Sequence, residues 1–314
     1  MKTIQYGKFG DVHVLQMVDI PQPTIASKQV LIKIKAVSIN PMDWKIRKGE
    51  MKLMSGSHFP KGTGVDFSGI IEEAGKDITH FKKGDEVFGI VNNLMKEGAL
   101  AEYVAVNEDK VWVKPASLSF SQASTIPIVG AAAALAVEKI GDITNHTEIL
   151  INGATGGFGM YLLQLLKQKG GLVTAVSNTA GVAFAKKWGA NFTIDYTKQN
   201  VLDADKPYDV VVDLSGKMGY DNAKHIMKEH SAFINPTPKP IEIISTPVID
   251  LFVGKKHIVL LSSPSSKNIP MLVKAVDNGL QIEVSKTFGF DHVTEAYTYA
   301  EKGGYIGKVT IELN

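Results

Sequence analysis

The stretch of this chain with the clearest chemical potential is a glycine-rich turn between an apolar run and a helical run. Residues 148–151 are largely apolar, glycines follow at 153, 156, 157 and 159, and a second apolar run covers Met160–Leu166. Glycines let the backbone approach a phosphate closely, and the free N–H groups at a helix start favour its negative charge. Because the glycine spacing is a variant of the usual fingerprint, the order strand, turn, helix carries the prediction of a dinucleotide site. The predicted phosphate contacts are Gly153, Ala154, Thr155, Gly156, Gly157, Phe158 and Gly159.

The end of the next predicted strand indicates which nicotinamide cofactor is bound. An acidic side chain there would bond the adenine ribose and repel a 2′-phosphate, whereas this chain has Ser177, Asn178 and Thr179. Their hydroxyl and amide groups can donate to a phosphate, which favours NADPH over NADH. No arginine follows Ser177, so the strongest charge partner is missing. The alternative for Asn178 is an ordinary N-cap of the helix expected at 180–188.

Three serines follow other predicted strands of the same region. Ser215 comes after the strand expected at 209–214, and Ser262 and Ser263 come after the strand expected at 258–261. Ligands of parallel sheets bind at the carboxyl ends of the strands. We therefore expect these serines to lie at the cofactor site.

The composition argues against several other kinds of site. The chain has 314 residues, 34 basic and 32 acidic side chains, and no cysteine. The nearly balanced charge and the lack of a basic block argue against nucleic acid as a partner. Without cysteine there are no disulfides, thiolate nucleophiles or cysteine-based zinc sites. His58, His80 and His225 have no recognisable ligand spacing, so we expect no bound metal.

The hydropathy pattern gives no sign of a membrane segment. The first residues lack the apolar core of a signal peptide, and the longest apolar stretch, at 126–137, is too short to span a bilayer. We expect a soluble, cytoplasmic protein with no membrane span.

The elements that must position these residues change in type near residue 120. Up to about Lys114 short β-rich runs alternate with turns, which predicts a β-barrel-like domain. From about Ser121 helical runs alternate with apolar strands, which predicts a second domain with a parallel sheet and right-handed crossovers. The last two expected strands should rejoin the first domain. Expected strands are 30–37, 86–91, 149–151, 172–176, 209–213, 232–234, 258–261, 281–284 and 308–313, and expected helices are 131–140, 180–188 and 269–278.

Blocks of residues along the whole chain carry a resemblance to a known family. They are residues 37–49, 64–69, 81–89, 154–159, 188–190, 194–196 and 307–309. In this order they resemble the medium-chain dehydrogenase/reductase superfamily and its zinc-free quinone oxidoreductase branch. The block from Asn40 to Lys45 is most similar to plant chloroplast-envelope quinone oxidoreductase-like proteins and enone reductases.

The resemblance implies an α/β fold with two domains. One is a Rossmann-type doubly wound parallel sheet that binds NADPH, at 121–279. The other is a GroES-like β-barrel catalytic domain, at 1–120 and completed by 280–314. The family also suggests a homodimer formed through the edge strand near 258–261.

The resemblance assigns a cleft beside the nicotinamide to Asn40, Asp43 and Lys45. From the residues alone, Asn-Pro followed by Asp is equally a turn and helix start. Asn40 stands near the place of the first zinc-binding cysteine of alcohol dehydrogenases, so zinc-assisted alcohol oxidation is excluded. Many relatives have a threonine that contacts the nicotinamide carboxamide, at the position of Ala132 in this chain. The resemblance therefore leaves this contact to the backbone groups of Val129 and Gly130.

Three further positions match the family pattern less fully. Tyr196 matches a tyrosine near the 2′-phosphate in related quinone reductases. Asp66 resembles a position that ligates zinc or orders the cleft, and a structural turn aspartate is an equal alternative. Ile306 stands before Gly307 and Lys308 where many relatives carry arginine, so Lys308 is expected at the surface.

Together these features predict an NADPH-dependent oxidoreductase that transfers hydride to the activated double bond of an enone or alkenal, without zinc. Asn40 or Lys45 would stabilise the enolate oxygen as it forms, and water would supply the proton. One alternative is an NADPH:quinone reductase with a wider aromatic cleft, for which the candidate rings are Trp44, Phe59 and Phe288. The other is a non-catalytic NADPH-binding or redox-sensing protein on the same fold. The loops at 48–60 and 236–250 are expected to decide the substrate class.

Overall fold

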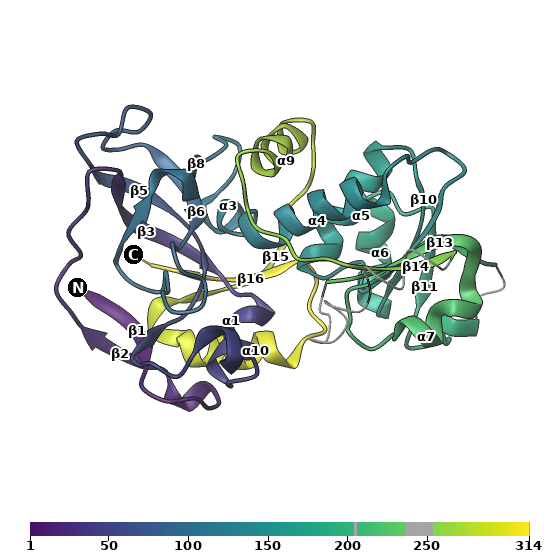
Figure 1. Ribbon diagram of the computed structural model, residues 1–314, viewed down its shortest axis with the longest axis horizontal. Coiled ribbons are helices and arrows are strands. Elements are labelled where there is room, and N and C mark those ends of the chain that lie inside the picture. Colours follow the sequence, from purple (N-terminus) through teal and green to yellow (C-terminus); the bar gives the residue numbers. More distant parts are fainter. Residues whose placement is uncertain (204–205, 237–245, 247–253, 314) are drawn as a thin grey trace. The chain divides into compact units, whose positions relative to one another are not determined.

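The chain folds into two compact units, and the computed structural model describes residues 1–203, 206–236, 246 and 254–313. The first unit comprises Met1–Ile128, Pro264–Ile269 and Val284–Asn314, and the second comprises Val129–Ser263 and Pro270–Glu283 (Figure 1). The loop at 236–250 lies outside the described residues except for positions 236 and 246. The predicted assignment of 1–120 with 280–314 to catalysis and of 121–279 to the cofactor stays a prediction.

The first unit is built on β-sheets. Among the described residues, a seven-stranded sheet has the order β15-β16-β3-β5-β6-β8, with β7 paired to β3, and a three-stranded sheet has the order β2-β1-β4. The strands are β1 (Lys2–Tyr6), β2 (Gln16–Asp19), β3 (Gln29–Ser38), β4 (Lys61–Gly62), β5 (Asp66–Ala74), β6 (Glu86–Ile90), β7 (Tyr103–Asn107), β8 (Val111–Val113), β15 (Val284–Gly289) and β16 (Lys308–Glu312).

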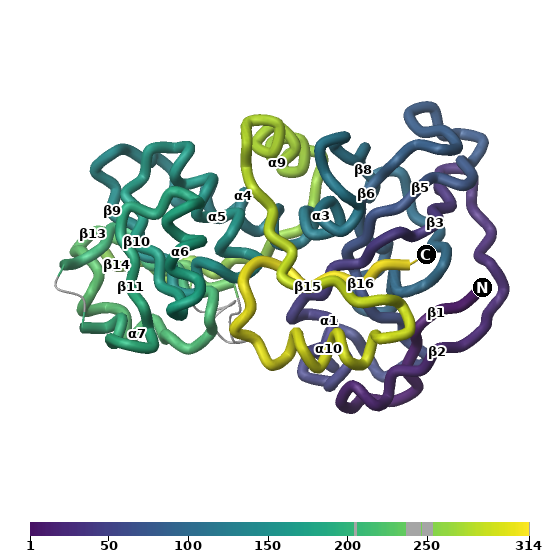
Figure 2. The backbone as a smooth tube through the Cα atoms, turned by 180° about the vertical axis from the view of Figure 1, so that it is seen from behind, coloured from purple at the N-terminus to yellow at the C-terminus, as the bar shows by residue number. Residues whose placement is uncertain are grey.

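Strand β3 organises this unit because β5, β7 and β16 all pair with it antiparallel. β16 pairs with β3 through Thr310 opposite Ser38, and Figure 2 follows the yellow C-terminal tube back beside the purple β3. The predicted strands at 30–37 and 308–313 are confirmed. The strand predicted at 281–284 begins three residues too early, since β15 starts at Val284 and the backbone N–H and carbonyl of Gln281 bond to the side chain of Gln164. Its return to the first unit is confirmed by the pairing of β15 with β16.

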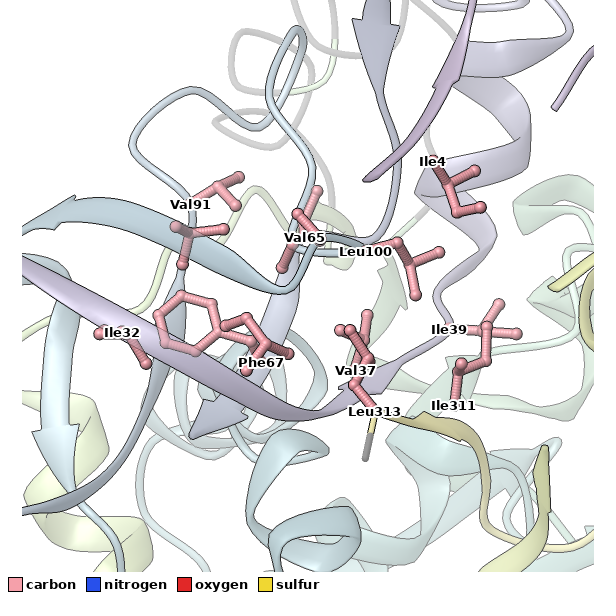
Figure 3. Close-up of a cluster of buried hydrophobic side chains, with 14 of the residues drawn as sticks. Ile4, Ile32, Val37, Ile39, Val65, Phe67, Val91, Leu100, Ile311 and Leu313 are labelled. Atoms are coloured by element: carbon pink, nitrogen blue, oxygen red, sulfur yellow. The ribbon is translucent and has the colours of Figure 1, made fainter. Parts of the chain in front are cut away.

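The core of the first unit lies between its strands and one helix. Figure 3 shows Ile32 and Val37 of β3, Phe67 of β5 and Ile311 of β16 converging on one cluster, and all four are fully buried. Helix α10 (Val293–Lys302) adds a buried stripe at Val293, Ala296, Tyr297 and Ala300, the spacing of one helix face.

The short helices of the first unit are α1 (Pro41–Arg47), α2 (Lys52–Ser55) and α3 (Phe120–Ser124). Helix α1 begins where it does because Pro41 occupies the first turn and Asp43 forms a capping box with Asn40. The Asn-Pro-x-Asp block is therefore a helix start, as its turn chemistry indicates.

The second unit contains a parallel sheet. Its order among the described residues is β11-β10-β9-β12-β13-β14, and every pairing is parallel. The reversal of chain order beside β9 is typical of a doubly wound fold, which confirms the predicted α/β class. The strands are β9 (Glu148–Asn152), β10 (Leu172–Ser177), β11 (Phe192–Asp195), β12 (Tyr208–Asp213), β13 (Met227–Asn235) and β14 (Lys255–Val259).

Helices alternate with the strands of this sheet along the chain, and the first of them precedes β9. They are α4 (Pro127–Ile140), α5 (Gly157–Gln168), α6 (Thr179–Lys187), α7 (Tyr220–Ala223) and α9 (Asn268–Asp277). Both α5 and α6 contact β10. Helix α9 is followed by Gly279 at φ +93, as its predicted glycine stop requires. No helix in the described ranges is both long and apolar enough to cross a membrane.

Candidate functional site

The glycine turn of the second unit lies between β9 and α5, and its glycines serve different purposes. Gly153 has φ +85, a conformation that favours glycine. A Cβ at Gly159 would lie 2.5 Å from the carbonyl carbon of Ala154, so glycine lets the helix pack on the turn. A Cβ at Gly156 would meet only the Gly153 carbonyl oxygen at 3.6 Å, which leaves the front of the helix start open.

The same turn leaves N–H groups available to an anion. The N–H groups of Gly153 and Ala154 both donate to the carbonyl of Val176, at 3.2 and 3.0 Å, which fixes the turn to the end of β10. Gly156 is the N-cap of α5 and has no side-chain capping bond. The first intrahelical bond runs from the N–H of Met160 to the carbonyl of Gly156 at 2.9 Å. The N–H groups before Met160 have no intrahelical acceptor. This geometry fits the pyrophosphate of a dinucleotide.

The three predicted phosphate donors after β10 are engaged in local bonds. The buried Ser177 hydroxyl donates to the carbonyl of Asn178 at 3.1 Å. The Asn178 carboxamide oxygen accepts from Gly181 N–H at 2.9 Å, so Asn178 is the N-cap of α6, the alternative that its position suggested. Thr179 donates to Asp195 at 2.6 Å. A side chain at Gly181 would begin 2.6 Å from the Thr155 hydroxyl oxygen, which explains why no lysine stands there.

Asp195 at the end of β11 is a residue of this edge that sequence reasoning missed. It pairs in register with Ser177 of β10, and its carboxylate accepts from the Thr179 hydroxyl and from both the N–H and the hydroxyl of Thr197. The bond from Thr179, followed by those from Thr197, lowers the pKa of Asp195 to about 2. Tyr196, next in the chain, is 52% exposed and donates its N–H to the Ser177 carbonyl. The signal available in the sequence was the acid directly before Tyr196.

The predicted serines occupy different surroundings. Ser215 donates to Asp213 at 2.7 Å and accepts from the Asn152 carboxamide at 2.9 Å. Asp213 is buried and also accepts from Met218 N–H, so it organises the end of β12, although the sequence did not single it out. Ser262 is half-buried and Ser263 is exposed beyond β14.

Val129 and Gly130 both lie in the first turns of helix α4. Both residues are buried. Their proposed contact with a carboxamide therefore rests on backbone groups.

A buried polar cluster in the first unit joins four segments distant in the sequence. The Lys308 ammonium donates to the Ile39 carbonyl and to the Asn40 carboxamide oxygen, both at 2.7 Å. The Asn40 amide donates to Asp66 at 2.9 Å, and Asp66 also accepts from Ser38 and from Ile128 N–H, both at 3.2 Å. The expectation that Lys308 lies at the surface is wrong, because this residue is only 3% exposed.

Burial shifts the charged groups of this cluster. It raises the pKa of Asp66 to about 7, against the opposing influence of Lys308. It also raises the pKa of Asp43 to about 7, and it lowers the pKa of Lys308 to about 8. One Asp43 oxygen accepts from Asn40 N–H at 2.8 Å, while the other is buried without a hydrogen-bond partner among the described residues.

The three residues predicted as catalytic thus differ. Asn40 is 1% exposed with both ends of its amide bonded internally, and Asp43 is 3% exposed. Lys45 is half-buried on α1, and its ammonium makes no hydrogen bond or ion pair within the described part of the chain. Lys45 is the one whose donor is available to a ligand.

The aromatic residues suggested for a wider cleft pack inside the first unit. Phe288 is 9% exposed in the core, and Trp44 packs against that core. Phe59 lies edge-on to Tyr6 and Phe9, with ring centres 6.0 and 5.0 Å away.

Comparison with known proteins defines the class. The family model described as alcohol dehydrogenase GroES-like domain matches residues 26–116, and the one described as zinc-binding dehydrogenase matches residues 188–311. A 2-methylene-furan-3-one reductase of Solanum lycopersicum is 33% identical over 99% of this chain and 79% of its own length. The chain belongs to the medium-chain dehydrogenase/reductase superfamily, in the zinc-free branch of quinone oxidoreductases and enone reductases.

Solved structures and further relatives agree with this class. The quinone oxidoreductase from Coxiella burnetii is 32% identical with a TM-score of 0.90, covering 100% of this chain and 99% of that one. An NADPH-dependent alkenal/one oxidoreductase of Arabidopsis thaliana, named chloroplastic, is 30% identical over 99% of this chain and 79% of its own length. This chain is an oxidoreductase that uses a nicotinamide cofactor.

The predicted cytoplasmic location is wrong by the same comparison. The Arabidopsis relative is named chloroplastic, and an NAD(P)H oxidoreductase of Bos taurus that is 32% identical over 91% of this chain is named mitochondrial. These names point to organelles instead of the plain cytoplasm.

The zinc in one family description does not fit the residues present. The chain has no cysteine, and the described residues contain no group of three or more His, Asp or Glu side chains arranged to hold a metal. The buried cluster that contains Asn40 and Asp66 already holds a cation, the Lys308 ammonium. A second positive charge beside that ammonium would be disfavoured.

Proposed function

We propose that this protein is an NADPH-dependent reductase of the activated double bond in α,β-unsaturated carbonyls. The observation that carries the proposal is the glycine turn, whose open helix start follows the central strand of a doubly wound sheet. The names of the tomato and Arabidopsis relatives support the substrate class, and the latter's name supports NADPH. The bound cofactor would supply the hydride.

The chain's own residues would bind and orient the reactants. The N–H groups of Gly157, Phe158 and Gly159, which have no intrahelical acceptor, would hold the pyrophosphate, and the rest of the turn from Gly153 to Gly156 would shape its approach. Ser177, Asn178, Thr179 and Tyr196 would surround the adenosine end, and the remaining predicted contacts are Val129, Gly130, Ser215, Ser262 and Ser263.

In the first unit, Lys45 is the donor that we assign to the developing enolate oxygen. Its side-chain nitrogen makes no hydrogen bond or ion pair within the described residues, and a preorganised donor stabilises charge that appears in the transition state. Asn40 and Asp43 would act on the same helix by fixing its start, because both belong to the capping box of α1.

Steady-state assays with enones, alkenals and quinones test this proposal. Following NADPH and NADH oxidation, we expect enone turnover with NADPH preferred. Lys45→Met should lower kcat by about a hundredfold with little change in cofactor affinity. Lys76→Met, which removes an exposed lysine after β5, is the matched control and should behave as the wild type.

Other outcomes would redirect the proposal. Turnover of quinones alone would favour a quinone reductase, as the name of the Coxiella structure suggests. Tight NADPH binding without turnover of any acceptor would favour a non-catalytic binding protein. Equal loss of activity in both lysine variants would remove the role of Lys45.

We also propose a homodimer through strand β14, as the family suggests. This strand ends the described sheet, so one of its edges has no neighbour in that sheet.

A further inference from the structure

The carboxyl ends of β10 and β11 bring one acid and two hydroxyls together where a dinucleotide fold receives the adenosine ribose. Ser177 and Asp195 are register partners at the last residues of these parallel strands. The acid that usually contacts the ribose follows the second strand. Here that strand ends in Ser177, and the acid stands at the end of the neighbouring strand.

The hydrogen-bond arrangement decides what Thr179 can offer a ligand. A threonine hydroxyl has one proton, and a carboxylate only accepts. The hydroxyls of Thr179 and Thr197 donate to different oxygens of Asp195, at 2.6 and 2.7 Å. Since both protons are used there, Thr179 presents lone pairs to a ligand. Lone pairs suit a ribose 2′-hydroxyl, which can donate, and do not suit a 2′-phosphate, which needs donors.

The negative charge of Asp195 also disfavours a 2′-phosphate. Its hydrogen bonds keep the pKa of Asp195 far below neutrality, so the carboxylate is ionised in any working buffer. Lys198 lies 3.5 Å from Asp195 but its side chain is 69% exposed, so water weakens its compensating charge. The Ser177 proton is committed to the Asn178 carbonyl, and neither Ser177 nor Asn178 carries a charge that would counter this repulsion.

We infer that Asp195 is a specificity-determining residue for the coenzyme, which opposes the 2′-phosphate directly and withholds the Thr179 hydroxyl from it. This inference rests on the proposed function. Its consequence is weak discrimination, with the affinities for NADPH and NADH within about tenfold of each other.

The test measures binding without turnover. Isothermal titration of the full chain with adenosine 2′,5′-bisphosphate and with adenosine 5′-monophosphate gives a ratio of affinities that isolates the 2′-phosphate. In Asp195→Asn the new amide can donate to the Thr179 oxygen and release its proton. This ratio should then shift toward the bisphosphate by about tenfold, from the lost repulsion and one freed donor. The ratio of the affinities for NADPH and NADH should shift in the same direction, toward NADPH.

Two further variants separate the local effect of Asp195 from a change in the net charge of the protein. Asp221→Asn, on α7, removes the same charge from an exposed pair with Lys224, and its ratio should match the wild type. In the double variant Asp195→Asn/Thr179→Val the shift should shrink, because the hydroxyl is gone. Thermal melting confirms that each variant is folded.

An unchanged ratio in Asp195→Asn would overturn the inference while leaving the cofactor site intact. A wild-type preference for the bisphosphate of more than a hundredfold would also overturn it. Absence of binding of both nucleotides, NADPH and NADH would refute the cofactor site itself and the inference with it.

Discussion

Asp66 of the first unit and Asp195 of the second show how the surroundings of a carboxyl group set its pKa. Each accepts three hydrogen bonds and has a lysine nearby. Yet the pKa of Asp66 is raised to about 7 and that of Asp195 is lowered to about 2. Asp66 is fully buried, while the Asp195 side chain retains contact with water. Desolvation therefore outweighs a similar set of bonds.

The difference also separates two roles. In the first unit Asn40 bonds to Asp43, Asp66 and Lys308, so these bonds fix the start of α1 and strand β16. In the second unit the ionised acid lies where its charge reaches a ligand. The bonds of the buried network fix the positions of backbone segments, whereas the charge of Asp195 can discriminate between ligands.

The largest expected effect is the loss of the buried lysine. Lys308→Met removes the cation beside Asp66 and Asp43 and leaves the Asn40 oxygen without its donor. Lys308 bonds to the Ile39 carbonyl and the Asn40 oxygen and interacts electrostatically with both carboxyls, so its removal should cost about 3–5 kcal/mol of the free energy of unfolding, as when a buried charge loses its partner. Urea unfolding followed by circular dichroism measures the change. A loss below about 1 kcal/mol would mean that the cluster is hydrated and would break the comparison.

An intermediate effect is expected in the dependence of stability on pH. Burial raises the pKa of Asp43 and Asp66 from 3.8 to about 7, so their contribution is fully present below 3.8 and lost as pH rises through about 7. The pKa of Lys308 falls from 10.5 to about 8, so its contribution is present above 10.5 and lost as pH falls through about 8. The cluster should stabilise the fold least between these two values.

Asp43→Asn tests this dependence because asparagine keeps the acceptor for Asn40 N–H. The decline in unfolding free energy between about pH 5 and about pH 7 should become shallower than in the wild type. Asp77→Asn, at an exposed position after β5, is the control and should retain the full decline. Parallel curves for Asp43→Asn and the wild type would show that Asp43 does not titrate in this range.

The smallest effect is expected when a lysine beside Asp195, in the second unit, is replaced by methionine. Lys198→Met removes a partner 3.5 Å from Asp195 whose side chain is 69% exposed. Exposed pairs of this kind contribute little, so the melting temperature should change by no more than about 2 °C. Calorimetry of Lys198→Met beside Lys308→Met measures the contrast. Comparable losses in both would remove the distinction between the two regions.

Local sequence patterns predicted much of this fold because they report local physics. The expected run 30–37 lies within β3, and the runs 149–151 and 172–176 lie within β9 and β10. The glycine turn was predicted because the positive φ at Gly153 and the close packing at Gly159 exclude other side chains. The strand expected at 281–284 starts only at Val284, because the side chain of Gln164 supplies the bonds of Gln281 that a neighbouring strand would have given.

The candidate site was predicted less fully because its bonds join distant residues. The partner of Lys308 is 268 positions away, and nothing near Lys308 in the sequence distinguishes a buried ammonium from a surface one. Thr179 and Asp195 are 16 positions apart and meet only because β10 and β11 are neighbours. Asn178 shows the converse, since a local rule for helix caps described it correctly.

Strand β16 has a consequence for the order of events during synthesis. The buried cluster needs Asn40 and Asp66 from early in the chain and Lys308 from its last strand. While the ribosome is still translating the intervening residues, Asp66 and Asn40 are without the Lys308 ammonium that completes their cluster. The second unit, whose strands all lie between 148 and 259, has no such dependence. The first unit therefore completes its core only after β16 has been synthesised, and it is the part that a chaperone would need to shield.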